Sequence, residues 1–363
     1  MVPTFMIMPS MACQASCKYC FGPYQGPMMS KDIMTQSAEF IKGVANQTQP
    51  SAIRIIFHGG EPLLLPLDRW RFLLTSLCES LTDYPLSFSV QSNLWRFDEE
   101  YAQLFAKFHV HVASSLDGPE IICDAQRGDG YFQKTMAGIR LAQRYGLLSG
   151  VIATITDQSK DQVQEVVNFF DKEELSVLLH EAQTGKRPGA ESYTINPKDF
   201  GEALLRVLPW YVDDAQHIFI RNYHQFASGL LRGNPRVCSL RDCLGMFLAI
   251  APDGNISSCQ RFAGLREYVL GNVRSKPSLE QLFDSEPALR QKDREERVRK
   301  ECAECGFVHI CHGGCYHNAV FAGDGIIDPQ CVSIRMIYSY LQEKMLDELT
   351  AQCEPKYRQL GMR

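Results

Sequence analysis

Three closely spaced cysteines near the start of the chain constrain what it can form more than any other feature. Cys13, Cys17 and Cys20 follow the spacing C-x3-C-x2-C, with no fourth cysteine or histidine close behind them. A structural zinc or iron–sulfur site takes four protein ligands, so three thiolates leave one coordination position open. A zinc site normally comes as two C-x2-C pairs, and a disulfide is a further alternative. The trio favours a thiolate-bound cluster with a place for a substrate or cofactor.

The remaining cysteines form one dense group and three isolated positions. Of the fourteen in the chain, eight lie between residues 238 and 331, while Cys78, Cys123 and Cys353 stand alone. In a reducing compartment, clustered cysteines are metal ligands or catalytic groups more often than disulfides. We interpret the isolated three as small buried residues or surface thiols. The other eleven are expected to carry the chemistry.

Composition and charge exclude several classes of protein. A hydrophobic content of 45% and a charged content of 22% are typical of a globular domain. The net charge of −5 and the lack of a long basic run give no case for binding nucleic acid. No stretch reaches the ~20 apolar residues that span a bilayer, and the first residues lack the basic segment and apolar core of a signal peptide. We therefore expect a cytoplasmic protein with neither a nucleic-acid nor a membrane partner.

Residues 1 to about 205 alternate short apolar runs with amphipathic helical segments, which is the pattern of β/α units. The expected strands are Thr4–Met8, Ala52–Phe57, Ser87–Gln91, Val110–Ser114, Leu148–Ile155 and Ser176–His180. The expected helices are Asp32–Asn46, Leu67–Leu81, Asp98–Phe108, Gln133–Tyr145 and Gln162–Phe170. Six strands with crossover helices predict an α/β fold in which a parallel sheet curls into a partial (β/α)6, TIM-like barrel. The trio follows the first strand, where loops of such barrels carry the working residues.

The last third of the chain has a different texture. Asp253-Gly254-Asn255 predicts a tight hairpin turn between strands at Phe247–Ala251 and Ile256–Cys259. A highly charged helix is expected over Ser285–Lys300, and a final amphipathic helix from Ser333 to about Cys353.

The C-x3-C-x2-C trio is the signature of the radical S-adenosylmethionine (SAM) superfamily, which this chain resembles closely. In that family three thiolates hold a 4Fe-4S cluster, whose open iron binds the amino and carboxylate groups of SAM. An electron from the cluster cleaves SAM to a 5′-deoxyadenosyl radical. The resemblance implies that Tyr19, before the last cysteine, lies near the adenine and that Phe21 helps to wall the cluster. Core packing is the alternative for both rings.

Further motifs of the family follow in the expected order. Gly59-Gly60-Glu61-Pro62 comes after the second strand and matches the GGEP motif. Its glycines are expected to let the backbone approach the SAM methionine, and its carboxylate or a carbonyl to accept from the SAM ammonium. Gln91-Ser92-Asn93 follows the third strand, where related enzymes place polar groups on the SAM ribose or amino group. The implied SAM contacts are Gly59, Gly60, Glu61, Pro62, Ser92 and Asn93.

A third motif follows the fourth strand. Ser115-Leu116-Asp117-Gly118-Pro119, with Asp124 and Arg127 after it, resembles the S-x-D-G-P…D-x-x-R run of the peptide-modifying branch. The resemblance implies that Arg127 holds the SAM carboxylate as a charge-assisted pair, with Ser115 and Asp117 also in the SAM site. A surface salt bridge is the alternative for Arg127.

The eight later cysteines are similar to the SPASM domain, named for enzymes that mature subtilosin, pyrroloquinoline quinone, anaerobic sulfatases and mycofactocin. The seven-cysteine pattern of that domain is complete, and Cys238 adds the extra ligand of anaerobic sulfatase-maturating enzymes. Eight thiolates close two 4Fe-4S clusters, which makes three with the first. The resemblance assigns Cys238, Cys243, Cys259 and Cys315 to auxiliary cluster I, and Cys302, Cys305, Cys311 and Cys331 to auxiliary cluster II. Two zinc sites are the alternative.

The resemblance divides the chain into three parts. We expect a radical SAM partial barrel over residues 1–205 and a helical bridge over 206–237. The SPASM domain, with two auxiliary clusters and the C-terminal helix, is expected over 238–363.

One position departs from the sulfatase maturases. There an Asp that follows the cysteine of the G-x4-C step is the proposed proton acceptor, whereas this chain has Gln260, followed by Arg261. An amide does not accept a proton at neutral pH. The sequence does not rank the other carboxylates, Asp242, Asp253 and Glu181. Five histidines are further candidates, although a histidine beside a cluster more often orients a ligand than reacts: His58, His180, His309, His312 and His317.

The resemblance as a whole implies an enzyme that cleaves SAM reductively and oxidises a residue of a ribosomal precursor peptide. A flavodoxin or ferredoxin-type protein would supply the electron. A thioether or carbon–carbon cross-link is favoured, because two complete auxiliary clusters suit a net two-electron oxidation. Formylglycine formation by a sulfatase maturase is one alternative. Peptide epimerisation, with Cys123 or Cys78 as the hydrogen donor, is another, and a non-catalytic iron–sulfur electron carrier is the alternative from a different class.

Overall fold

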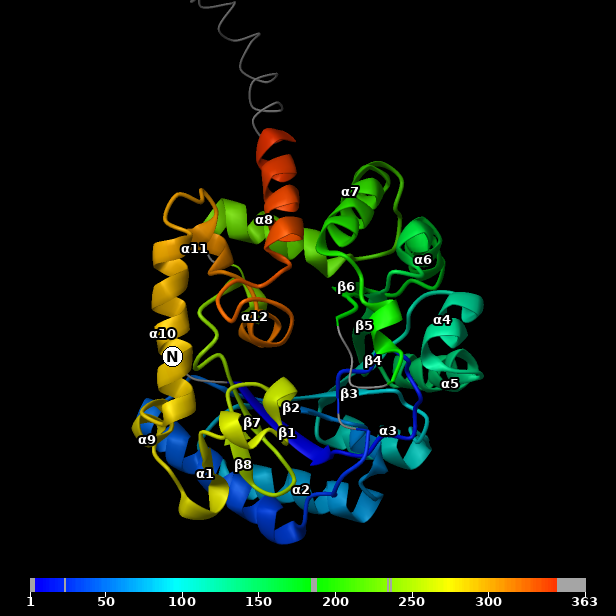
Figure 1. Ribbon diagram of the computed structural model, residues 1–363. Helices are drawn as coiled ribbons and strands as arrows, with labels where there is room; N and C mark the ends of the chain where they lie inside the picture. The colour runs from blue at the N-terminus through cyan, green and yellow to red at the C-terminus, as the bar shows by residue number, and fades with distance from the viewer. Residues whose placement is uncertain (1–3, 23, 184–187, 234, 236, 345–363) are drawn as a thin grey trace, which may run out of the picture.

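The fold is built on one sheet that runs through both halves of the chain. The computed structural model describes residues 4–22, 24–183, 188–233, 235 and 237–344. Within these residues the sheet has nine strands in the order β6-β5-β4-β3-β2-β1-β7-β8-β9. In Figure 1 the strands β1 to β6 follow an arc with helices outside it.

Strands β1 to β6 are parallel, each to its neighbour, and helices connect them. This arrangement confirms the α/β class and the partial (β/α)6 barrel, because parallel strands require such crossovers. The strands are β1 Thr4–Ser10, β2 Ile53–Gly59, β3 Leu86–Ser92, β4 Val110–Ser115, β5 Leu148–Ile155 and β6 Val177–Glu181. All six expected strands are present at nearly their expected bounds.

The helices of this half cover the outer face of the arc (Figure 1). The five expected helices are found as α1 Lys31–Thr48, α2 Leu67–Ser80, α3 Glu99–Lys107, α5 Tyr131–Arg144 and α6 Val163–Lys172. A sixth helix, α4 Glu120–Arg127, occupies a stretch for which the sequence predicted only a loop motif. Two more, α7 Pro197–Asp213 and α8 Arg221–Arg232, follow β6.

Alternation along the strands separates the two faces of the arc. In β2, Ile53, Ile55 and Phe57 are fully buried, while Arg54 and His58 lie on the opposite face and reach solvent. The buried face packs on the helices through aromatic contacts, with the Phe57 and Trp70 rings 4.9 Å apart. Because successive side chains of a strand point to opposite faces, the inner face of the arc carries the polar residues.

The second half of the chain joins the same sheet. The expected hairpin is present as β7 Phe247–Ile250 and β8 Asn255–Ser257, followed by β9 Gly271–Asn272. The hairpin turn contains Gly254 at φ +87°, a conformation that favours glycine. The sequence did not predict that β7 pairs in parallel with β1. This pairing fixes the cysteine-rich segment against the edge of the barrel.

The remaining elements lie across the ring from the helices of the barrel (Figure 1). They are α9 Leu279–Phe283, α10 Glu286–Glu301, α11 Val308–Cys311 and α12 Tyr316–Ala322. Helix α10 confirms the charged helix expected there. Residues 331–344 are helical, which agrees with the first part of the expected C-terminal helix, and its end at Cys353 lies outside the described residues. None of the described helices is long and apolar enough to cross a membrane.

Candidate active site

The trio lies in the loop that follows β1, at the C-terminal edge of the sheet. The Cys13 thiol interacts electrostatically with those of Cys17 and Cys20. The loop is held from two sides, since Cys13 N donates to Tyr24 O at 3.1 Å and Lys18 N donates to Gln126 O at 2.9 Å. Burial raises the pKa of Cys13 to about 12 and that of Cys17 to about 11. Three thiols that become good ligands only when a metal deprotonates them suit a cluster site.

The GGEP loop packs directly on the trio loop. Gly60 N donates to Ser10 O at 2.9 Å, and Glu61 N donates to Ala12 O at 2.8 Å. A Cβ atom at Gly59 would lie 2.4 Å from Ser10 O, and one at Gly60 would lie 2.3 Å from Ala12 O. The glycines are therefore required for backbone contact between the two loops, a reason that differs from the expected approach to SAM.

Glu61 is used inside the protein. Its side chain is 1% exposed and accepts hydrogen bonds from Leu63 N (2.9 Å), Ser92 Oγ (2.7 Å) and Asn93 N (2.8 Å). Burial raises the pKa of this carboxyl, and the three hydrogen bonds oppose the rise. The carboxylate joins the loops after β2 and β3. This geometry argues against the expected contact between the Glu61 carboxylate and the SAM ammonium.

The loop after β3 brings an amide to the trio. Asn93 Nδ2 lies 4.0 Å from Cys13 Sγ, and its Oδ1 accepts from Trp95 N at 3.0 Å and from Gln14 Nε2 at 3.3 Å. On β4, Ser115 Oγ accepts from Gln91 Nε2 at 2.9 Å, on the inner face. The expected SAM residues of β3 and β4 thus gather at the same edge as the trio.

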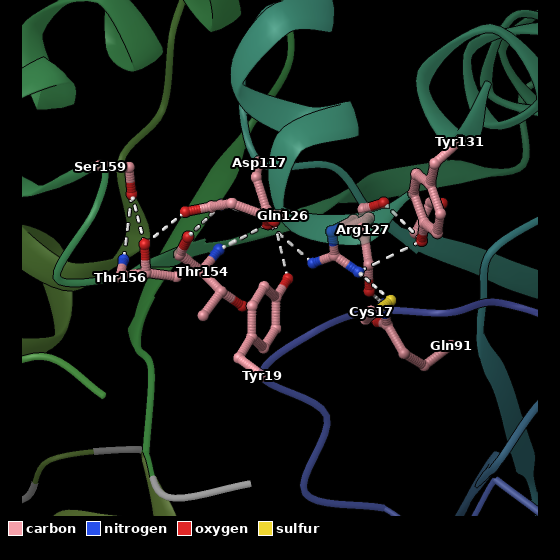
Figure 2. Close-up of polar contacts among 12 residues, drawn as sticks. Cys17, Tyr19, Gln91, Asp117, Gln126, Arg127, Tyr131, Thr154, Thr156 and Ser159 are labelled. Carbon is pink, nitrogen blue, oxygen red and sulfur yellow. Dashed lines mark hydrogen bonds and ion pairs between the residues drawn. The ribbon is translucent and has the colours of Figure 1, made fainter. Parts of the chain in front are cut away.

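Asp117 and Arg127 form a buried ion pair behind the trio (Figure 2). The Nη2–Oδ1 distance is 2.7 Å, and the two side chains are 7% and 0% exposed. Surface placement, the alternative for Arg127, is therefore wrong. Asp117 also accepts from Tyr19 Oη (2.7 Å), Gln126 Nε2 (2.9 Å) and Thr154 N (2.9 Å), so both of its oxygens are used within the protein.

The guanidinium of Arg127 faces the trio. Its Nη1 lies 3.9 Å from Cys17 Sγ and donates to Tyr131 Oη at 3.2 Å. The rings of Tyr19 and Tyr131 lie within 5.4 Å and 5.1 Å of it. Its Nε atom is buried without a hydrogen-bond partner in the described residues. Arg127 thus keeps one donor for a ligand, whereas Asp117 and Tyr19 position it.

Four of the later cysteines form one electrostatic group. The Cys243 thiol interacts with those of Cys238, Cys315 and Cys259, and the Cys238 thiol with those of Cys259 and Cys315. Burial raises the pKa of Cys238 to about 12 and that of Cys259 to about 11. Cys315 is far away in sequence from the other three, so this grouping reproduces the interleaving expected for auxiliary cluster I.

The other four form a second group. The Cys331 thiol interacts with those of Cys302 and Cys305, and the Cys311 thiol with those of Cys331 and Cys305. Among the described residues, no three His, Cys, Asp or Glu side chains converge as they do around a single metal ion. A four-iron cluster binds each thiolate to a different iron, so its ligands stand farther apart. Both groups have the donor set of such a cluster.

Arg261 connects the two halves of the site. Its Nη1 lies 3.8 Å from Cys315 Sγ and donates to Asn318 Oδ1 at 2.7 Å, and its Nη2 donates to Gln183 Oε1. The guanidinium carbon lies 4.8 Å from the ring of Phe21, which follows the last cysteine of the trio. The sequence named Arg261 without assigning it a role. Only its place directly after Gln260 indicated a function.

Two histidines lie on the inner face at the same edge. His58, on β2, lies 3.1 Å from the amide of Gln260 through its Nε2. Burial lowers the pKa of His58 to about 4, and burial with Arg261 and Arg221 lowers that of His180 to about 4. The His180 side chain is nevertheless exposed. A group that protein surrounds and solvent still reaches must face a hollow, which we place at the inner face of β6.

The three candidate carboxylates occupy different places. Asp242 Oδ1 lies 3.0 Å from His312 Nδ1, and the Asp242 side chain is 44% exposed. Asp253 accepts from Asn255 N at 3.0 Å within the hairpin turn. Glu181 ends β6 and bonds to Gln183, which contacts Arg261. The structure brings only Glu181 of the three to the seam between the trio and auxiliary cluster I.

The other candidates lie elsewhere. Cys123 is fully buried on α4 and Cys78 is half-buried on α2, both on the helices outside the arc. Neither faces the inner side, which removes the hydrogen donors considered for epimerisation. His309 accepts from the His312 ring through its backbone oxygen, beside auxiliary cluster II. His317 packs against the Phe262 ring at 5.2 Å.

Comparison with known proteins agrees with this geometry. Residues 7–170 match the model of the radical SAM superfamily, and residues 238–306 match SPASM, an iron-sulfur cluster-binding domain. An uncharacterized protein of Methanothermobacter thermautotrophicus is 36% identical over 62% of this chain and 86% of its own length. The cysteine-type anaerobic sulfatase-maturating enzyme of Clostridium novyi is 25% identical over 84% of this chain and 85% of its own.

Two solved structures share the fold. Native anSMEcpe with bound AdoMet and Cp18Cys peptide has a TM-score of 0.84 at 22% identity, covering 95% of this chain and 99% of that chain. Streptococcus suis SuiB bound to precursor peptide SuiA has a TM-score of 0.60 at 18% identity, covering 90% and 75%.

Proposed function

Because the chain belongs to the radical SAM superfamily and to its SPASM branch, we propose that it oxidises a residue of a ribosomal precursor peptide. The favoured product is a thioether or carbon–carbon cross-link. The peptides named in the anSMEcpe and SuiB structures support a peptide as the substrate class. The electron would come from a flavodoxin or ferredoxin-type protein.

One observation carries the proposal. Arg261 contacts Cys315 of auxiliary cluster I and, on its other side, the Phe21 ring beside the trio. The two cluster sites therefore face each other across a short gap lined by the inner residues His58, His180 and Gln260. A peptide side chain held in this gap lies within reach of both sites. That is what oxidation by loss of a hydrogen atom and then of an electron requires.

The donor sets fit three 4Fe-4S clusters. Cys13, Cys17 and Cys20 would hold the first, and the two later groups of four would hold the auxiliary clusters. When bound, the first cluster and SAM supply a 5′-deoxyadenosyl radical. Arg127, through its unpartnered Nε, and Asn93 are the residues that would orient SAM beside Cys17 and Cys13. The parts of the chain are proposed as a SAM barrel over 1–205, a bridge over 206–237 and a SPASM domain over 238–363.

Formylglycine formation is the second candidate. It is supported by the Clostridium novyi relative and by the extra cysteine, Cys238. Gln260 weighs against it, because the family's proposed proton acceptor is an Asp at this position. Both candidates use the same inner site.

The test is an anaerobic assay of the reconstituted enzyme with dithionite and SAM. One sample receives the Cp18Cys peptide, and another receives a Cys-rich peptide encoded beside the gene. Loss of two hydrogens, with a covalent link that blocks fragmentation between two residues, supports cross-linking. Formylglycine in the Cp18Cys peptide would overturn it in favour of the second candidate. If neither sample yields 5′-deoxyadenosine, the enzyme proposal itself fails.

A further inference from the structure

Oxidation of the peptide radical leaves a proton that needs an acceptor. Gln260 is an amide, and its neighbour His58 does not supply the missing base. Gly59 N donates to His58 Nδ1 at 2.8 Å, so the neutral ring carries its proton on Nε2. Since two N–H groups do not bond each other, the Gln260 amide oxygen must face Nε2, an orientation that coordinates leave open. Both nitrogens of His58 are then engaged.

The surroundings of Glu181 suit a proton acceptor. It lies at the C-terminal end of β6, where barrels of this kind place reacting groups. Gln183 Nε2 donates to its Oε1 at 2.6 Å, and the Asn318 side chain also bonds to the carboxylate. Gln183 and Asn318 are the same two residues that bind Arg261. The carboxylate is therefore part of the network that connects β6 to auxiliary cluster I.

We propose that Glu181 is the proton acceptor of the oxidation. This inference rests on the proposed function and holds for both of its candidates. After a hydrogen atom has left a peptide carbon, cross-linking breaks a thiol S–H bond and forms a C–S bond. Formylglycine formation breaks the S–H bond of the same residue and forms C=S. Either way one proton passes to Glu181, and one electron passes to the four-iron cluster held by Cys238, Cys243, Cys259 and Cys315.

The charges around Glu181 agree with this role. Burial raises the pKa of the Glu181 carboxyl, while Arg261, Gln183 and Asn318 lower it. Asp328, across the seam, is the other charged group that interacts with it, and His180 beside it on β6 is neutral. A carboxyl with a raised pKa is a stronger base than an ordinary one and remains charged at neutral pH.

The test compares Glu181→Gln with a matched control, Glu173→Gln. Glu173 follows α6, which precedes β6, and is exposed on the outer side, where it pairs with Arg140. The assay uses whichever peptide the wild type oxidises, labelled with deuterium at the reacting carbon. We expect Glu181→Gln to transfer deuterium into 5′-deoxyadenosine at nearly the wild-type rate. Its oxidised product should fall by roughly 10²-fold or more, and Glu173→Gln should match the wild type.

The outcomes separate the proposals. Wild-type product formation in Glu181→Gln would overturn the role of Glu181, as would a parallel loss of deuterium transfer and product. If the wild type itself oxidises no peptide, the proposed function fails instead. Glu181→Asp keeps a carboxylate and should retain more product than Glu181→Gln, which controls for misfolding. The wild-type rate of product should fall at acid pH as Glu181 is protonated, and this limb should be absent in Glu181→Gln.

A readout without turnover uses carboxyl labelling. The holoenzyme is treated with a water-soluble carbodiimide and an amine, with and without SAM and the Cp18Cys peptide, and the modified residues are mapped by mass spectrometry. We expect Glu181 to be modified and then protected several-fold by the peptide, while Glu173 is unprotected. An unmodified Glu181, or one that the peptide leaves unprotected, would contradict the proposal.

Discussion

Two arginines, each beside a cluster cysteine, show how the two ends of the site differ. Arg127 Nη1 lies 3.9 Å from Cys17 Sγ, and Arg261 Nη1 lies 3.8 Å from Cys315 Sγ. Arg127 is buried against the carboxylate of Asp117, which neutralises it. Arg261 binds the neutral amides of Gln183 and Asn318, so within the described residues no carboxylate pairs with it directly.

The difference indicates two functions for one type of residue. A neutralised arginine changes the local charge little and serves to position groups around SAM. An arginine without a direct counter-charge leaves a positive potential on the nearest thiolates, which favours the reduced form of the cluster that they hold. We infer that the first end starts the radical and that the second end receives the electron. Four predictions test this comparison.

The largest effects are expected from removing one thiolate at each end. Cys17→Ala should abolish SAM cleavage, because the only cluster with an open position loses a ligand. Cys243→Ala should keep measurable SAM cleavage and lose peptide oxidation. Iron should fall in each variant from about twelve to about eight atoms per chain, the loss of one cluster. Iron analysis and 5′-deoxyadenosine assays make the measurement, and equal loss of SAM cleavage in both variants would contradict the division.

The buried pair at the first end should be sensitive to loss of one partner. Asp117→Asn leaves the Arg127 charge buried without compensation, which costs about 3–5 kcal/mol of unfolding free energy. Denaturant unfolding measures this cost, and SAM affinity should fall as well. Glu99→Gln is a matched control, since its pair with Arg144 is exposed and should contribute less than about 1 kcal/mol. Equal costs for the two variants would mean that Arg127 is not buried as described.

At the second end, Arg261→Gln should change redox behaviour more than stability. Removing a unit charge beside Cys315 should lower the midpoint potential of auxiliary cluster I by on the order of 100 mV. Redox titration followed by electron paramagnetic resonance measures the potential. Arg261→Lys, which keeps the charge, should restore most of it. An unchanged potential in Arg261→Gln would show that Arg261 acts only by packing.

The smallest effect is expected from Gln260→Asp. An Asp here would accept the proton of His58 Nε2 and place a second carboxylate near Glu181. With Glu181 intact, product formation should change by less than about threefold, because an acceptor is already present. In a Glu181→Gln background the same substitution should recover part of the lost product. Product yield is quantified by mass spectrometry, and full loss of product in Gln260→Asp alone would contradict the role of Glu181.

Much of the fold follows from local patterns in the sequence. Alternating apolar runs and amphipathic stretches predicted six strands and five helices of the barrel, because burial on one face leaves a clear period. The turn at Gly254 predicted the hairpin for the same kind of local reason. The parallel pairing of β7 with β1 was not predictable, since it joins strands more than two hundred residues apart without a local signal. Helix α4 was missed because its motif residues suggested a loop.

The site was predictable in its ligands more than in its supporting contacts. Cysteine spacing gave both groups of four, including the crossing of Cys315, through family resemblance. The roles of Glu61 and Asp117 were less accessible, because a buried carboxylate bound to its neighbours has the same sequence as one that binds a ligand. The ranking of Glu181 over Asp242 and Asp253 needed the three-dimensional seam around Arg261.

The division of labour is tested most directly by following deuterium from a peptide labelled at the reacting carbon. Wild type and Cys243→Ala are compared under identical anaerobic conditions with dithionite and SAM. The account predicts deuterium in 5′-deoxyadenosine from both proteins, and oxidised peptide from the wild type alone. Oxidised peptide from Cys243→Ala at the wild-type rate would contradict it, because the electron would then leave by a route that does not need auxiliary cluster I.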